Sequence, residues 1–131
     1  MKQCIQFTFL AFISLLGCKS TSNLDNTKPD FVIAFGSCNN QNVENKLWTA
    51  ILENDPDVWV WGGDNIYADT NDMAKMANDY KLQKEEPQYQ TLLKKSKIIG
   101  TWDDHDYGLN DAGEEYEMKD ISQQLFLDFF D

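Results

Sequence analysis

A chain of 131 residues allows one domain at most, and its 42% hydrophobic and 13% aromatic residues suffice for a core. It carries 22 acidic against 11 basic residues, a formal net charge of -11 at pH 7. This balance argues against a nucleic-acid-binding surface, because no basic stripe exists to displace counterions from phosphates. An acidic protein that handles phosphate must obtain positive charge elsewhere, and metal ions can supply it.

The N-terminal segment is typical of an export signal. Its apolar run, residues 5–16, is shorter than the ~20 residues of a membrane span. The run ends in "LLGC", which resembles a bacterial lipobox, so we expect residues 1–17 to be a lipoprotein-type signal peptide and Cys18 to be lipidated. Residues 18–29 would be a flexible tether to the membrane at the cell envelope or exterior. An ordinary secretory signal with an incidental cysteine is the alternative.

Cys38 is the cysteine left in the folded body, because Cys4 leaves with the signal peptide and Cys18 is lipidated. An exported domain with a single thiol cannot form an internal disulfide. We therefore expect the thiol of Cys38 to be either buried or chemically active.

The first part of the body pairs a strand pattern with a helix pattern. The run "FVIAF" at 31–35 is continuously apolar, as expected of a strand covered on both faces. Asn39 and Asn40 then offer caps for a helix that ends before Pro56. The apolar stripe of this predicted helix consists of Val43, Leu47, Trp48, Ile51 and Leu52.

The pattern then repeats twice. Residues 57–63 and 97–102 form β-branched and aromatic runs typical of strands. Between them we expect a helix at about 71–84 and, after the break at Pro87, a second helical stretch through Lys95. A last helical stripe contains Ile121, Leu125, Phe126, Phe129 and Phe130. Strands that alternate with helices predict an α/β fold, with a mostly parallel sheet flanked by helices and with Trp59, Trp61 and Trp102 used for packing.

Each predicted strand runs into a polar loop, namely "GSCNNQ", "GGDNIYADT" and "DDHDYGLND". Because ligands of open α/β sheets bind beyond the carboxyl ends of the strands, these loops should meet at one edge. They carry plausible metal ligands: Cys38, Asp64, Tyr67, Asp104 and His105. The acids packed around His105 repel one another and raise each other's pKa values, which a bound cation would relieve. We interpret them as part of a multinuclear metal site.

The motifs "FGSC", "WGGDNIYAD" and "TWDDHDYGLND", in this order and each after a strand, resemble the alkaline phosphatase D (PhoD-like) family of calcineurin-like metallophosphoesterases. The resemblance implies that residues 30–131 are the N-terminal part of a metallophosphatase domain with a layered sandwich fold, truncated at the C-terminus. It implies hydrolysis of phosphoric esters, monoesters or diesters, by two metals that lower the pKa of a shared water and orient it toward phosphorus.

The resemblance also implies roles for the first two loops. Cys38 would bind iron as a thiolate, and Tyr67 would bind the same iron as a phenolate. Asp64 would bridge both metals, since each of its oxygens can serve one ion.

In the third loop, Asp104 would bind the second metal, for which calcium is the choice that the family implies. Asp103 and Asn110 are further ligand candidates. His105 would be the catalytic residue, placed against the substrate phosphate, where it stabilises charge or protonates the leaving oxygen.

Two non-catalytic alternatives stay open. One is a calcium-binding module, because the pattern from Asp104 to Glu115 imitates an EF-hand loop, although Gly108 stands where a ligand belongs and Leu109 where the turn needs glycine. The other is an envelope-anchored binding lipoprotein that retains the fold without catalysis.

His105 is the single histidine of the chain, whereas enzymes of this group complete their site with histidine motifs from a second half of the sheet. We therefore expect this chain alone to bind the second metal poorly, to hydrolyse little and to expose apolar surface.

Overall fold

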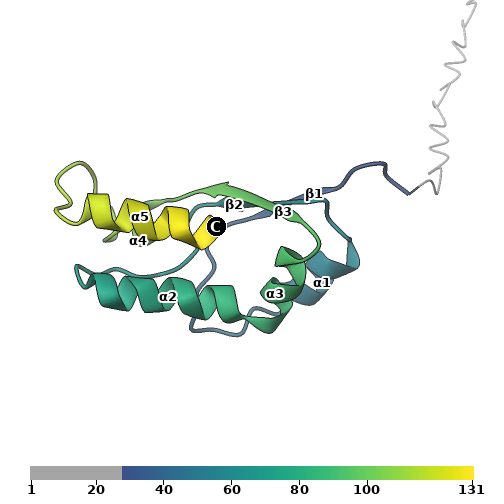
Figure 1. The fold of residues 1–131 in the computed structure, drawn as a ribbon, viewed down its shortest axis with the longest axis horizontal. Coiled ribbons are helices and arrows are strands. Elements are labelled where there is room, and N and C mark those ends of the chain that lie inside the picture. The colour runs from purple at the N-terminus through teal and green to yellow at the C-terminus, as the bar shows by residue number, and fades with distance from the viewer. Residues whose placement is uncertain (1–27) are drawn as a thin grey trace, which may run out of the picture.

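The computed structural model describes residues 28–131, and it is a mixed α/β arrangement around a small parallel sheet (Figure 1). In chain order the elements are β1 (Ile33–Gly36), α1 (Leu47–Glu53), β2 (Val58–Gly62), α2 (Met73–Glu85), α3 (Pro87–Leu93), β3 (Lys97–Thr101), α4 (Asp104–Tyr107) and α5 (Lys119–Phe130). The predicted α/β class is confirmed at this level. The predicted signal peptide and the lipid site at Cys18 lie outside the described residues. Within residues 28–131, the helices are too short or too polar to cross a membrane.

The sheet has three strands in the order β1-β2-β3, and both pairings are parallel. Figure 1 shows the helices on one side of this sheet. Side chains alternate between the two faces of a strand, so Trp59 and Trp61 point to the helices while Val58 and Val60 point away from them. Because all three strands are parallel, their carboxyl ends lie at one edge of the sheet.

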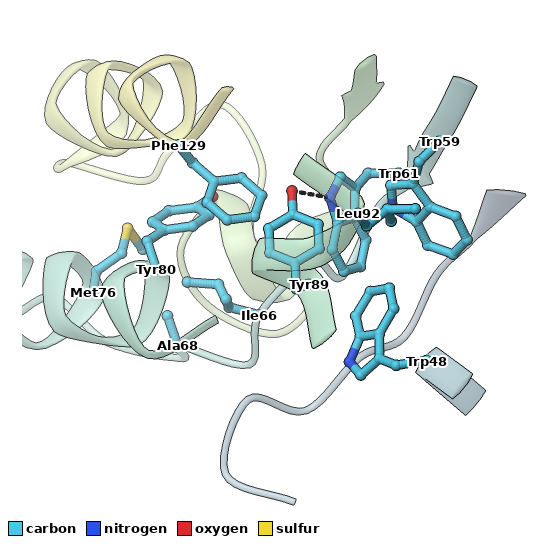
Figure 2. Packing of buried hydrophobic residues seen from close by; sticks show 10 residues of the cluster. All are labelled: Trp48, Trp59, Trp61, Ile66, Ala68, Met76, Tyr80, Tyr89, Leu92 and Phe129. Atoms are coloured by element: carbon cyan, nitrogen blue, oxygen red, sulfur yellow. Dashed lines mark hydrogen bonds between the residues drawn. The ribbon is translucent and has the colours of Figure 1, made fainter. Parts of the chain in front are cut away.

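Aromatic rings fill the space between the sheet and the helices, and Figure 2 shows how they gather. The indoles of Trp59 and Trp61 meet edge to face at 5.4 Å between ring centroids. Trp48 of α1 packs on both, and Tyr89 of α3 accepts a hydrogen bond from Trp61 Nε1 at 2.9 Å. Phe129 of α5 extends the cluster toward α2. The predicted packing role of these tryptophans is confirmed, and Trp102 likewise packs on Phe126 and Tyr107.

The ends of the helices between β2 and β3 are set by capping residues and a proline that can be recognised in the sequence. Asp72 caps α2 by accepting hydrogen bonds from the backbone of Ala74 and Lys75. Pro87 occupies the first turn of α3, where its missing N–H is not needed, and Glu86 caps this turn. The predicted break at Pro87 is confirmed.

The prediction that the first strand is covered on both faces is wrong for the described chain. Ile33 and Phe35 of β1 are 58% and 80% exposed, and Ile99 of β3 lies exposed on the same face. The helices of residues 28–131 all pack on the opposite face, so this apolar face of the sheet stays uncovered.

The predicted start of the first helix at Asn39 and Asn40 is also wrong, because α1 begins at Leu47. Asn39 is buried and binds the backbone of the loop after β2, and Asn40 closes a local turn by accepting from the backbone of Asn42. Both asparagines thus use their side chains to hold a loop. As a result, Val43 and Leu47 are 64% and 66% exposed and do not join the core.

Candidate metal centre

The loops that follow the three strands are bonded to one another at one edge of the sheet. The backbone N–H of Cys38 donates to the carbonyl of Gly63 at 3.2 Å, and that of Asn39 donates to Asp64 at 2.8 Å. Gly63 has φ +98°, and a Cβ there would lie 2.7 Å from Cβ of Asp103. Because the backbones approach so closely, only glycine fits at this position.

A buried hydrogen-bond network fastens the loop after β2 to the segment after β3. Asp106 is fully buried, and its Oδ2 accepts from both the backbone and the side chain of Asn65, at 3.1 and 2.6 Å. Its Oδ1 accepts from the backbone of Asp103 at 2.7 Å, and Asn65 also donates to the carbonyl of Thr101 at 2.9 Å. Burial raises the pKa of Asp106 to about 6, although these donors oppose the rise. Both oxygens of the Asp106 carboxyl group are thus engaged in hydrogen bonds that hold the loops together, and the group does not point toward the candidate metal ligands.

Two of the predicted metal ligands likewise serve local structure. Asp103 is the N-cap of α4 and forms a capping box with Asp106. Asn110 is exposed and donates to the side chain of Asp111 at 2.7 Å. Asp103 is not part of the group of Asp64, Asp104 and His105 that is described below, and Asn110 stays a predicted ligand.

Asp64 lies at the centre of the candidate site. Its Oδ2 is 3.5 Å from Cys38 Sγ and 3.3 Å from the hydroxyl of Tyr67. Its Oδ1 is buried without a hydrogen-bond partner among the described residues. No described lysine or arginine forms an ion pair with this nearly buried carboxylate. A buried carboxylate oxygen without a partner is costly, and a bound cation would remove that cost.

Cys38 and Tyr67 form a first set of potential ligands around Asp64. Asp104 and His105, both on α4, form a second set of potential ligands around it. One potential ligand atom from each of Asp64, Asp104 and His105 lies within 4.8 Å of the others. The backbone N–H of Asp111 donates to Asp104 Oδ2 at 2.5 Å and is the main reason why the pKa of Asp104 lies below its usual value. Asp104 is therefore ionised at neutral pH and available to a cation.

Tyr67 of the first set also contacts the second set. Its ring packs on the imidazole of His105, with the centroids 4.3 Å apart. Desolvation raises the pKa of Tyr67 to about 12, helped by the hydrogen bond with Cys38 and the charge of Asp64. The metal-free phenol therefore keeps its proton, and a metal that binds Tyr67 as a phenolate has to displace that proton. The thiol of Cys38 beside it is free and exposed.

Asp69 is a residue of this site that the sequence analysis missed. Both of its carboxylate oxygens contact Nδ1 of His105, at 2.7 and 2.9 Å. The backbone of Ala68 donates to the carbonyl of His105, which holds the two segments together. Desolvation lowers the pKa of His105, but the hydrogen bond and charge of Asp69 outweigh it, so the pKa lies above its usual value. In the sequence, the only indication of this role of Asp69 was that it is a further acidic residue in the loop after β2.

The backbone of this edge is strained. Cys38, Asp64, Asp69 and Asp111 all have positive φ, between +44° and +59°, in the region that residues other than glycine seldom adopt. Such residues cost of order 1–3 kcal/mol each and concentrate at functional sites. Four of them in three converging loops indicate that this edge is held in a demanding geometry.

The arrangement does not match an EF-hand loop. Residues 104–107 form the helix α4, and the buried carboxylate of Asp106 points into the network with Asn65 while Asp104 lies near His105. Glu115 accepts from the nearby backbone of Gly113. Its carboxylate is engaged locally, whereas an EF-hand needs it on the ion.

One edge of the sheet thus gathers a thiol, a phenol, two carboxylates and an imidazole that is held by a third carboxylate. Asp64 contacts the thiol of Cys38, a soft donor, and lies near the carboxylate of Asp104, a hard donor, so this edge offers donors of both kinds. No family model, curated protein or solved structure matches this chain.

Proposed function

We propose that this chain carries part of the active site of a metal-dependent phosphoric ester hydrolase, related to the alkaline phosphatase D family that its motifs resemble. The observation that supports this best is the placement of Asp64. One of its oxygens meets Cys38 and Tyr67, its other oxygen is buried without a partner, and Asp104 and His105 lie close by. A carboxylate shared by two donor sets is what a pair of metals requires.

The donors divide by chemistry. Cys38 and Tyr67, with Asp64, would hold iron, because thiolate and phenolate suit a transition metal. Asp64 and Asp104 would hold calcium, which prefers carboxylate oxygens. When bound, the metals would supply the positive charge that lowers the pKa of water and stabilises the leaving oxygen.

The protein's own residues would handle the substrate. His105 has a raised pKa, so a larger fraction of the imidazole is protonated than in free histidine, and its charge favours an anionic phosphate. The rest of the chain is strongly acidic and repels such a substrate. We therefore place His105 as the group that contacts the phosphate and protonates the leaving oxygen.

The same proposal covers the parts of the protein that surround the site. We propose that the sheet is part of a layered sandwich of the metallophosphoesterase type, of which residues 30–131 form the N-terminal portion. We also propose export to the cell envelope, with a lipid anchor at Cys18.

Metal content and turnover test this function together. The chain is loaded with iron and calcium, dialysed and analysed for both metals, and then assayed with 4-nitrophenyl phosphate and bis(4-nitrophenyl) phosphate. We expect iron in the wild type together with weakly held calcium, in less than a stoichiometric amount because this chain alone binds the second metal poorly, and we expect loss of both metals in Asp64→Asn. Asp55→Asn is the matched control, because Asp55 has a similar φ of +47° but is exposed at the amino ends of the strands.

The outcomes separate the alternatives. Iron together with calcium supports the hydrolase, calcium alone supports a calcium-binding module, and no metal supports a binding lipoprotein. Turnover is expected to be low for this chain by itself. Fast turnover would contradict the view that further residues complete the site.

A further inference from the structure

We propose that two copies of this chain stack through the uncovered face of the sheet, with their strands antiparallel about a two-fold axis. Each copy then supplies the second layer that the sheet of the other copy lacks. The proposal depends on neither metal nor phosphate, because it concerns the side of the sheet opposite the helices (Figure 1).

The uncovered face is apolar at its centre and carries no acid. Paired residues of neighbouring strands lie side by side, so the side chains that point away from the helices form rows across the sheet. The first row is Ile33, Val58 and Lys97, the second is Phe35, Val60 and Ile99, and the third contains Gly62 and Thr101. The chain has 22 acidic residues, yet none stands in these rows. The cores of protein interfaces are likewise poor in charge and rich in aromatic side chains.

The rows differ in bulk, and this difference makes the face complementary to itself. The first row, near the amino ends of the strands, has the branched side chains of Ile33 and Val58. In the third row Gly62 has no side chain, and a Cβ there would lie 3.4 Å from Cβ of Ser37, so Ser37 extends this row. When a two-fold axis passes through the second row, the first row of each copy lies over the third row of the other. Large side chains then fill the space above small ones, as close packing requires.

The antiparallel stack also suits the single charge of the face. Lys97 lies on β3, an outer strand of the sheet, and it would face Thr101 of the second copy. At this border its methylene groups can cover apolar surface while its ammonium group stays in water. A parallel stack would place each row over itself, so that large residues would oppose one another and Gly62 would face Gly62 across a gap.

The area of the face predicts a weak dimer. Strands about 4.8 Å apart, with up to five residues at about 3.3 Å each, cover about 14 by 17 Å, and Phe31, 59% exposed just before β1, adds to this area. Two such faces would bury on the order of 900 Å² in total, as weak and transient interfaces do. Each copy also has a net charge of -11, so the copies repel one another. We expect a dissociation constant on the order of 10 μM that falls at high salt, because salt screens this repulsion.

Sedimentation equilibrium of the full chain, between about 1 and 100 μM and at low and high salt, tests the proposal. We expect a monomer–dimer equilibrium for the wild type. Phe35→Thr removes the ring at the centre of the stack and should weaken the dimer about tenfold or more. Leu127→Gln is the matched control, because Leu127 is 50% exposed but lies on α5, and it should leave the dissociation constant unchanged. The N-terminal segment is the same in all variants, so it does not cause a difference between them.

Ser37→Leu tests the orientation of the two copies. It adds apolar surface to the face, which would strengthen a parallel stack or unspecific association. In the antiparallel stack the added side chain meets Ile33 of the second copy, so the dimer should weaken about tenfold. Dispersed amide spectra show that each variant is folded.

The outcomes that contradict the proposal are distinct. A monomer at every concentration, species larger than a dimer, or a dimer that Phe35→Thr leaves intact would overturn it. A stronger dimer in Ser37→Leu would refute the antiparallel stack. None of these results depends on metal content, so the proposed function and this inference can fail separately.

Discussion

Asp104 and Asp106 lie two residues apart on the same short helix, yet they occupy opposite environments. Asp106 is fully buried and accepts hydrogen bonds from Asn65 and Asp103, whereas Asp104 lies at the edge of the sheet near Asp64 and His105. One carboxylate holds the loops together and the other is available to a cation. Acids that cluster in a sequence therefore need not form one site, because some of them build the frame that positions the rest.

Removal of the structural acid should have the largest effect. Asp106→Ala leaves the buried donors of Asn65 and Asp103 without acceptors, and each unsatisfied donor costs about 1–3 kcal/mol. We expect the free energy of unfolding to fall by about 3–5 kcal/mol, measured by urea denaturation. Asp104→Ala, on the same helix, should change it by less than about 1 kcal/mol. Similar losses in both variants would break the contrast between the two acids.

The next largest effect should be the pH dependence of the unfolding free energy that Asp106→Ala loses. Burial raises the pKa of Asp106 to about 6, well above its usual value, so the folded protein binds this proton more tightly than the unfolded chain. The contribution of Asp106 to stability is therefore full below about pH 4 and decreases as the pH rises to about 6, by about 2–3 kcal/mol.

The difference in unfolding free energy between wild type and Asp106→Ala isolates this contribution from other titrating groups. It should be larger at pH 4 than at pH 7. A difference that is constant across this range would mean that the hydrogen bonds of Asp106 fully offset its burial.

Substitution of Asp104, the acid near the candidate ligands, should lower metal affinity with little change in the free energy of unfolding. Asp104→Asn removes a charged ligand, and we expect calcium affinity to fall at least about tenfold, or about 1.4 kcal/mol, by isothermal titration calorimetry. The unfolding free energy of the metal-free protein should change by less than about 0.5 kcal/mol. Calcium binding that survives in Asp104→Asn would remove Asp104 from the site.

The smallest effect is expected at Asp103, which belongs to the structural side of the contrast. Asp103→Ala removes the N-cap of α4 and should cost about 1 kcal/mol of unfolding free energy. Asp103→Ser keeps a cap and should recover most of that loss. Calcium affinity should be unchanged in both variants, and a tenfold loss in both would return Asp103 to the list of ligands.

Much of the fold could be predicted because its signals are local. The apolar runs and the proline at 87 predicted three strands and most of the helices, and the polar residues after each strand predicted the shared edge. The start of the first helix could not be predicted, since Asn39 and Asn40 are typical caps by local rules. Their actual partners, such as the backbone of Asn65, are distant in sequence.

The site divides in the same way. Cys38, Asp64, Tyr67, Asp104 and His105 could be chosen because each follows a strand, and the structure brings them together. Whether they bind metals stays a prediction. The roles of Asp69 and Asp106 could not be separated from the sequence, because all the acids in these loops look alike until their hydrogen-bond partners are known.

The indoles of Trp48, Trp59 and Trp61 have ring centroids within 5.8 Å of one another. At such separations their electronic transitions couple, and absorbed ultraviolet light is shared among them. The circular dichroism of the indole bands should therefore change when α1 packs on the sheet, because Trp48 of α1 then lies against Trp59 and Trp61 of β2. The part of this signal that involves Trp48 is lost when α1 lifts from the strands, whereas the pair of Trp59 and Trp61 on β2 keeps its own part.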